Sequence, residues 1–283
     1  MVSNQIALTR HLAGMRGRSN PFLAEASDGV LYVVKYADRS TGLLSMFCEC
    51  AGSILFEAAG LPVPKWRPLL LTDTFLKSLQ DNDLRATLES GLSRSPLVFG
   101  SRYLGGEFGR ILEILPSITL GRVKNRMDFW LAWLLDVCLR QTDNRQAMFC
   151  ELANRQLFAY FIDHGSLFDD ADYSPHRQIV AARYLDHRIY QDLSSRCFQS
   201  AVNSLQSIDL EYVWRLVRDI PEEWLSKQAL DRLSESLNRI STREVVLSIS
   251  AGMADIADNV KVSFRGVIEE ERKQPASLLR PGL

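Results

Sequence analysis

Hydrophobic and polar positions alternate through most of the first third of the chain, which predicts β-strands. We expect strands at residues 4–11, 22–26, 30–36, 66–71 and 97–104. The second and third flank Ser27-Asp28-Gly29, a sequence typical of tight turns, and should form a hairpin. One helix is expected in this region, over residues 44–59, because Gly60 and Pro62 follow it directly.

Helical periodicity dominates the rest of the chain. Residues 124–140 are apolar nearly all round, which predicts a buried helix. Within it, Asp136 and Arg140 are spaced to pair along one helix face. Apolar stripes at residues 212–220 and 230–240 predict two amphipathic helices that pack onto a core.

A β-rich part followed by a helical part indicates an α+β protein with two lobes and a cleft between them. We expect the first lobe at residues 1–104 and the second at residues 105–272, with the boundary near Gly105-Gly106. Residues 273–283 are expected to form a flexible tail.

Composition excludes several functional classes. The formal net charge of −1 gives no global attraction to nucleic acid or to an anionic membrane, so neither is expected as a partner. The N-terminal residues contain no apolar run typical of a signal peptide, and residues 129–139 are too few to span a bilayer. The five cysteines show no zinc-ligand spacing. Their odd number without a secretion signal predicts reduced thiols and a cytoplasmic location.

Two aspartates flank a predicted hairpin in the second half of the chain. Residues 147–151 and 156–162 are expected to be its strands, joined by a tight turn. Because a hairpin brings its two ends together, Asp143 and Asp163 should be neighbours. Either residue alone is better explained as a turn or cap residue. Together they suggest a divalent metal with bound phosphates, since Mg²⁺ prefers carboxylate and water oxygens.

The first lobe offers groups that would complement such a site. Lys35 shares a strand face with an apolar residue, so it could point into the cleft, although an exposed strand lysine is the simpler reading. Glu49 on the following helix could pair with Lys35, and Glu57 competes for that role. The loop that contains Gly17 and Ser19 could wrap phosphates with its N–H groups and the hydroxyl.

Six segments in this order resemble the HipA-like kinases over roughly residues 10–245. They are SNPFLAEASDGVLYVVKY, Glu49 with the helix ending in GLPVP, FGSRYLGG, TDNRQ, IDHG and IPEEWL. The resemblance implies a two-lobed kinase-like fold that uses ATP and Mg²⁺. It also implies roles for four residues: Lys35 on the ATP phosphates, Glu49 as its partner, Asp143 as the catalytic aspartate and Asp163 as the Mg²⁺ ligand. FGSRYLGG would lie near the adenine, with contacts from the segment that includes Phe99, Arg102 and Tyr103.

One departure from the family pattern bears on activity. The family usually has a metal-binding Asn five residues after the catalytic aspartate, but here that residue is Met148, whose thioether is a poor Mg²⁺ ligand. Asn144 or Gln146 could supply an amide oxygen instead.

The resemblance as a whole implies a serine/threonine-type kinase acting on a protein. The alternative is a pseudokinase that binds nucleotide and works as a regulatory or interaction module. His164 is expected to have a structural role beside Asp163.

Overall fold

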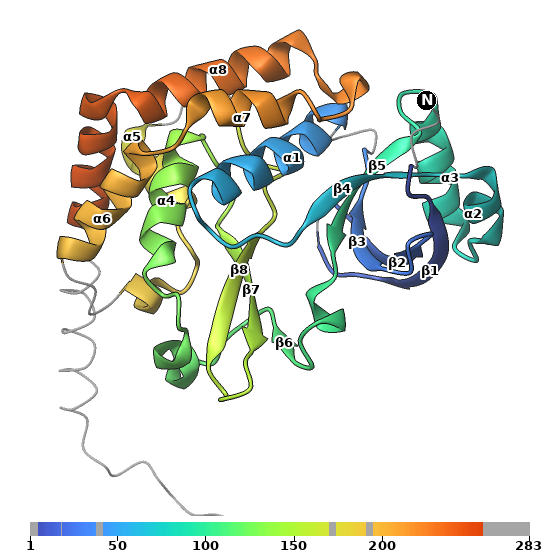
Figure 1. The fold of residues 1–283 in the computed structure, drawn as a ribbon, viewed down its shortest axis with the longest axis horizontal. Coiled ribbons are helices and arrows are strands. Elements are labelled where there is room, and N and C mark those ends of the chain that lie inside the picture. Colours follow the sequence, from blue (N-terminus) through green and yellow to red (C-terminus); the bar gives the residue numbers. More distant parts are fainter. Residues whose placement is uncertain (1–4, 18, 38–41, 170–173, 191–194, 257–283) are drawn as a thin grey trace, which may run out of the picture.

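The computed structural model describes residues 5–17, 19–37, 42–169, 174–190 and 195–256. The expected flexible tail at 273–283 lies outside these residues. The fold is α+β, with an antiparallel sheet formed by the N-terminal part and helices formed by the C-terminal part, as the sequence predicts (Figure 1). No helix in the described ranges is long and apolar enough to cross a membrane.

The N-terminal sheet has five strands in the order β1-β2-β3-β5-β4, all paired antiparallel. The strands are β1 (Leu8–Gly14), β2 (Phe22–Ala26), β3 (Leu31–Lys35), β4 (Trp66–Leu70) and β5 (Leu97–Arg102). Alternation decides which face each side chain takes: Tyr32 and Val34 of β3 are buried in the core of the sheet. Val33 and Lys35 therefore lie on the opposite face, which borders a cleft.

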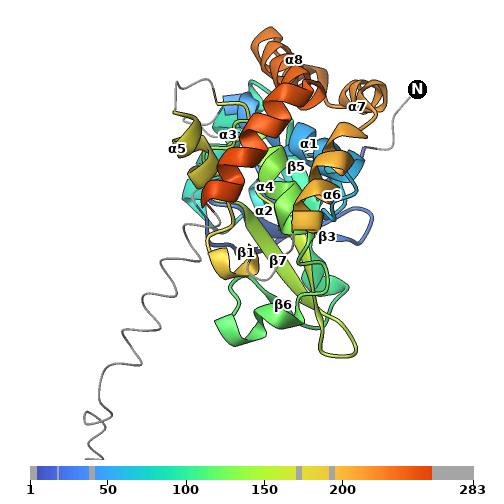
Figure 2. The same ribbon diagram turned by 90° about the vertical axis from the view of Figure 1, so that its left-hand side faces the viewer.

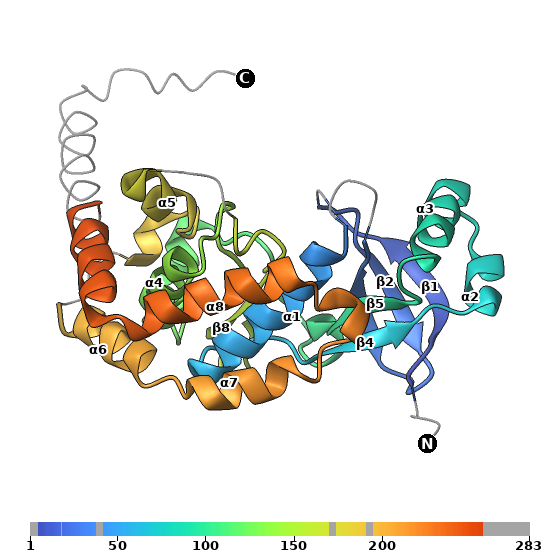
Figure 3. The same ribbon diagram turned by 90° about the horizontal axis from the view of Figure 1, so that it is seen from above.

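Helix α1 (Gly42–Ala58) joins the two parts of the molecule. It follows the N-terminal strands in sequence, yet it packs against α7 (Leu210–Val217) and α8 (Lys227–Ser241) (Figure 3). Its central residues are buried nearly all round, in one core with α4 (Asp128–Cys138). The remaining helices are α2 (Asp73–Ser78), α3 (Asn82–Leu92), α5 (Pro175–Ala181) and α6 (Ser195–Gln206), with short 3₁₀ turns η1 (Leu104–Gly106), η2 (Ser117–Arg122), η3 (His187–Tyr190) and η4 (Glu222–Trp224). The expected lobe limits at residues 104 and 105 stay a prediction.

A second, three-stranded sheet lies on the far side of the cleft. Its order is β6 (Ile111–Leu112), β7 (Gln146–Glu151) and β8 (Leu157–Ile162), visible below α4 in Figure 2. The expected hairpin is present, since β7 and β8 pair from Gln146 opposite Ile162 to Glu151 opposite Leu157. The hairpin therefore begins three residues after Asp143 and ends directly before Asp163.

The expected pairing of Asp136 with Arg140 is wrong. Helix α4 ends at Cys138, and Arg140 has a backbone φ of 56°, so it no longer lies on the helix face. Asp136 instead forms an ion pair with Arg145, and Arg140 pairs with Glu235 of α8.

Some boundaries also differ from the expected ones. Helix α4 begins at Asp128 rather than at residue 124, because the Asn125 side chain bonds both the N–H and the carbonyl of Ala159 in β8. Strand β1 extends to Gly14, beyond the expected end at residue 11. Helices α2 and α3 were not expected, although Thr72 and Asp81 cap their first turns with side-chain hydrogen bonds.

Candidate active site

A cleft of about 1270 Å³ separates the five-stranded sheet from the β7–β8 hairpin. It is lined by residues from the loop after β1, from β3 and β5, and from α1. Residues at the start of β7 and at the end of β8, with the loops next to them, line the other side. The cleft brings together all of the site residues expected from the sequence, namely Gly17, Ser19, Lys35, Glu49, Phe99, Arg102, Tyr103, Asp143, Asn144, Gln146 and Asp163.

Lys35 is the centre of a three-residue charged cluster. Its Nζ lies 2.5 Å from Glu49 Oε1 and 2.7 Å from Asp163 Oδ1. The second oxygen of Glu49 accepts a hydrogen bond from the His164 N–H at 3.1 Å. Three elements therefore converge at this point: β3 brings the ammonium group, α1 brings one carboxylate, and the end of β8 brings the other. Glu57, the alternative partner, is exposed.

The cluster keeps Lys35 and Asp163 charged, whereas burial raises the pKa of Glu49. Burial raises the pKa of Asp163, but the ammonium group of Lys35 outweighs it and the pKa is lowered overall. Burial lowers the pKa of Lys35, but Glu49 and Asp163 together raise it above its usual value. The ammonium group and the Asp163 carboxylate therefore both stay ionised at neutral pH, as phosphate and metal binding require.

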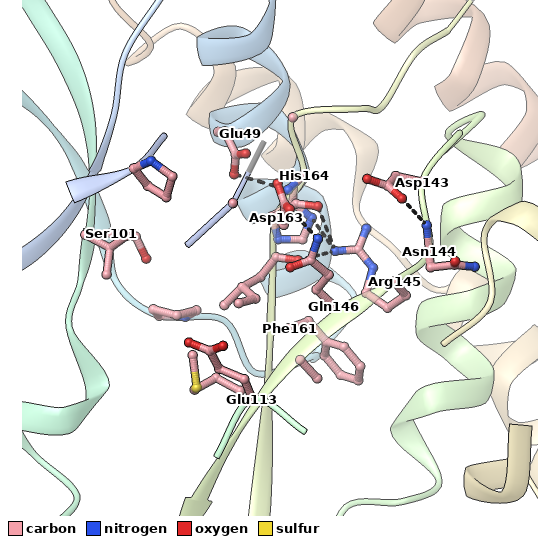
Figure 4. Close-up of a pocket in the computed structure, with 18 of the residues that line it drawn as sticks. Glu49, Ser101, Glu113, Asp143, Asn144, Arg145, Gln146, Phe161, Asp163 and His164 are labelled. Atoms are coloured by element: carbon pink, nitrogen blue, oxygen red, sulfur yellow. Dashed lines mark hydrogen bonds between the residues drawn. The ribbon is translucent and has the colours of Figure 1, made fainter. Parts of the chain in front are cut away.

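Asp143 faces the same cleft from the loop that precedes β7. One of its carboxylate oxygens accepts the N–H of Asn144 at 2.9 Å, and the other is turned toward the side where Asp163 lies (Figure 4). The Asn144 amide is directed elsewhere, because its Nδ2 donates to the carbonyls of Ala181 and Arg183 at 3.0 and 3.3 Å. Asp143 is thus held by its own loop, and among the described residues its second oxygen has no hydrogen-bond donor.

Gln146 is better placed than Asn144 to take part in a metal site. Its Nε2 donates to Asp163 Oδ2 at 2.6 Å, so its amide group lies beside the carboxylate expected to bind metal. Met148 packs in a small apolar cluster with Leu104 and Cys150, and it also lines the cleft. Two residues separate Asp143 from β7. Gln146, the first residue of β7, is therefore the one that approaches Asp163.

The donor set fits a magnesium site. Among the described residues no group of three or more His, Cys, Asp or Glu side chains is arranged to hold a metal ion. Mg²⁺ in phosphate-transferring sites is usually bound through one or two carboxylates together with phosphate and water oxygens. Asp163 could supply the carboxylate and Gln146 an amide oxygen, while Lys35 lies where phosphates would complete the site.

His164 has the structural role expected from the sequence. Its ring is buried and meets the edge of Phe56 with the ring centroids 4.6 Å apart. Burial, together with the charges of Arg145 and Lys35, lowers the pKa of His164 well below its usual value, so the ring is neutral. Two glycines allow this segment to approach α1: a Cβ on Gly52 would lie 2.4 Å from His164 Cβ, and one on Gly165 would lie 2.9 Å from Glu49 Oε1.

The close approach at Gly52 leads to a first prediction. Ala is normally more stable than Gly inside a helix by roughly 0.5–1 kcal/mol. At Gly52 the added methyl would overlap His164 and Leu167, so we expect Gly52→Ala to destabilise the protein by about 1–3 kcal/mol. The matched control is Gly91→Ala in α3, where the nearest atom would be 3.4 Å away. Urea unfolding of the two variants compares them, and equal stability would refute the proposed contact.

The most buried charged pair of the site, Arg145 with Asp136, was not predicted from the sequence. Arg145 and Asp136 have side chains that are 1% and 0% exposed, and they form a two-pronged ion pair with distances of 2.6 and 2.7 Å. The Arg145 guanidinium also lies over the Phe56 ring, 4.8 Å from its centroid. An arginine next to a catalytic loop is a weak signal by itself, because only the fold reveals which buried acid it contacts.

Comparisons with known proteins identify the family and support the fold. The family model described as HipA-like kinase matches residues 10–248. The chain belongs to the HipA-like kinase family. The match covers both sheets of the cleft and most of the helical part, so it includes every residue of the charged cluster. A comparison with curated proteins gives no match.

A solved kinase structure supports the kinase-like fold. A proinflammatory kinase of Helicobacter pylori, CtkA, aligns with a TM-score of 0.52 at 12% identity over 86% of this chain and 95% of that chain. The Golgi casein kinase with Mn/ADP bound aligns with a TM-score of 0.44 at 14% identity over 89% of this chain and 75% of that one. At such low identity the CtkA likeness concerns the fold alone. This HipA-like kinase therefore shares the two-part architecture of a known kinase.

Proposed function

We propose that this HipA-like kinase transfers the γ-phosphoryl group of ATP, with Mg²⁺, to a serine or threonine hydroxyl of a protein. Membership of the HipA-like kinase family supports a kinase-type phosphotransferase without specifying its acceptor. The observation that carries the proposal is the Lys35 ammonium bonded to both Glu49 and Asp163, in the cleft that also contains Asp143. A location in the cytoplasm remains a prediction from the cysteines.

Each residue of the site would have a separate role in the reaction. Lys35 would hold the ATP phosphates, and Glu49 fixes its position. Asp143 would accept the proton of the acceptor hydroxyl while that oxygen bonds to the γ-phosphorus and ADP leaves with the electrons of the broken P–O bond. A bound Mg²⁺ would neutralise phosphate charge, with Asp163 and Gln146 as its protein ligands. Most of the rate enhancement would come from positioning and electrostatics.

The opposite end of the cleft would hold the base. Phe99 and Tyr103 line it, with Ser101 between them and Glu113 across from it (Figure 4). Phe99 stacks on Trp66 with the ring centroids 5.9 Å apart, which fixes the apolar wall of this end. Phe99 pairs with Lys35 and Ser101 pairs with Val33, so the phosphates would bind at the Lys35 end of β3 and the base farther along β5, toward Ser101 and Tyr103.

Binding and turnover are tested separately. Calorimetry with a non-hydrolysable ATP analogue and Mg²⁺ should show binding to the wild type, and Lys35→Met should weaken it. ATP consumption with candidate protein acceptors then distinguishes the two functions: consumption supports the kinase, whereas Lys35-dependent binding without consumption under Mg²⁺ or Mn²⁺ supports the pseudokinase. No binding at all would contradict both. The observation that favours the pseudokinase is Met148, which stands where the family usually has a metal-binding asparagine.

Gln146 provides a second prediction. If its amide oxygen completes the metal site, Gln146→Ala should raise the Mg²⁺ concentration needed for half-maximal turnover by roughly 10–100-fold. Met148→Leu is the control, because Leu fills a similar volume in the apolar cluster and should leave the Mg²⁺ requirement unchanged. A metal titration of both variants decides the matter, and an unchanged requirement in Gln146→Ala would exclude this residue as a ligand.

A further inference from the structure

Arg145 contacts three elements that border the active site, namely α4, the end of β8 and α1. Its Nε and Nη2 bind the Asp136 carboxylate on α4, at 2.7 and 2.6 Å. Its Nη1 donates to the carbonyl of Ile162 at 2.6 Å and lies 3.3 Å from the carbonyl of Asp163, at the end of β8. In sequence it stands two residues after Asp143, in the loop that carries the proposed catalytic carboxylate.

The backbone that Arg145 holds is not relaxed. Asp163 has a φ of 64°, in the left-handed region that non-glycine residues rarely adopt. Such a conformation persists only where the surroundings impose it. Besides Arg145, the Gln141 side chain reaches the Asp163 carbonyl, at 3.4 Å. The hydrogen bonds from the Arg145 guanidinium to the Ile162 and Asp163 carbonyls therefore lie where the chain turns to direct the Asp163 carboxylate into the cleft.

Stability alone does not explain a pair placed in this way. Burying two charges is costly, and apolar side chains of similar volume often replace a buried ion pair without loss of stability. An arginine fork offers what an apolar pair cannot, namely several donors in one plane with a fixed geometry. The stack on Phe56 of α1 further restricts the guanidinium plane.

We propose that Arg145 is a positioning residue: anchored on Asp136, it sets where the metal-binding Asp163 lies relative to the catalytic Asp143. This inference rests on the proposed function, because it assigns Asp163 to the metal. It predicts that metal affinity depends on a side chain that touches no metal. Substitution of ion pairs that do not make these hydrogen bonds should not lower the metal affinity.

The test replaces the pair by neutral side chains of similar size, Asp136→Leu with Arg145→Met. The control makes the same changes in an exposed ion pair of the N-terminal sheet, Arg10→Met with Glu25→Leu. Circular dichroism first checks that each protein unfolds cooperatively. The affinity for ADP without metal is then measured, followed by the affinity for Mn²⁺ in the presence of ADP from the electron paramagnetic resonance signal of free Mn²⁺.

We expect the buried double variant to bind ADP within about threefold of the wild type and Mn²⁺ roughly 10–100-fold more weakly. The exposed double variant should match the wild type in both. A buried double variant with wild-type Mn²⁺ affinity would overturn the positioning role and leave the proposed function intact. A wild-type protein that binds no Mn²⁺ with ADP would overturn both.

Arg145→Lys is a second variant that keeps a charge opposite Asp136. A lysine ammonium has no planar fork and cannot bind Asp136 on one side and the Ile162 carbonyl on the other in the same geometry. We therefore expect the same loss of Mn²⁺ affinity in a folded protein, even if the double variant fails to fold. Wild-type Mn²⁺ affinity in Arg145→Lys would contradict the proposal.

Discussion

Asp143→Asn should reduce the turnover number for phosphoryl transfer by about 10²–10⁴-fold, the usual contribution of a positioned general base. An amide cannot accept the proton of the acceptor hydroxyl, whereas its shape is close to that of the carboxylate. The bond from the Asn144 N–H to Asp143 can still form with an amide oxygen, so the loop should keep its conformation. Nucleotide affinity should change little, because Lys35 and Asp163 remain in place.

The measurement is steady-state turnover beside calorimetric nucleotide binding. Asp73→Asn in α2 is the matched control, since Asp73 is exposed and lies outside the cleft. Loss of turnover together with loss of binding would indicate a disrupted fold rather than a missing base. Full turnover in Asp143→Asn would exclude Asp143 as the catalytic base.

Asp136→Ala should lower the free energy of unfolding by about 3–5 kcal/mol, the usual effect of removing one partner of a buried ion pair. Burial raises the pKa of Asp136 to about 6 against the opposing charge of Arg145, so the carboxylate is ionised at neutral pH. Its removal would leave the Arg145 guanidinium buried without a counter-charge. Urea unfolding at pH 7 measures the loss.

Glu235→Ala provides the comparison. Glu235 also pairs with an arginine, Arg140, but its side chain is 61% exposed, and water screens such pairs. We expect little change in stability there. If Asp136→Ala were as stable as Glu235→Ala, the buried pair would not be the structural support that the geometry indicates.

The elements with a strong periodic pattern could be predicted from the sequence. The β2–β3 hairpin followed from its turn residues, and α1 followed from Gly60 and Pro62. The β7–β8 hairpin was the most useful of these predictions, because it placed Asp143 and Asp163 at one end of the same hairpin. The choice of Glu49 over Glu57 agrees with the structure for a physical reason: only Glu49 lies on the buried side of α1, opposite Lys35.

Contacts between distant side chains could not be predicted in the same way. Asp136 has a suitably spaced partner in sequence, Arg140, yet the helix ends before that residue and the true partner is Arg145. The approach of His164 to α1 depends on Gly52, whose role is invisible until both segments are placed. These contacts are set by how α1, α4 and the hairpin pack together, and local pattern carries no information about that packing.

Transfer of label from γ-labelled ATP to protein tests the central claim most directly. The wild type would be incubated with Mg²⁺ or Mn²⁺, alone and with a mixture of protein acceptors, beside Asp163→Asn and Lys35→Met. We predict label on a serine or threonine of a protein with the wild type and none with either variant. Equal labelling by the variants, or no labelling by a wild type that still binds nucleotide, would contradict the proposal that the cluster of Lys35, Glu49 and Asp163 serves phosphoryl transfer.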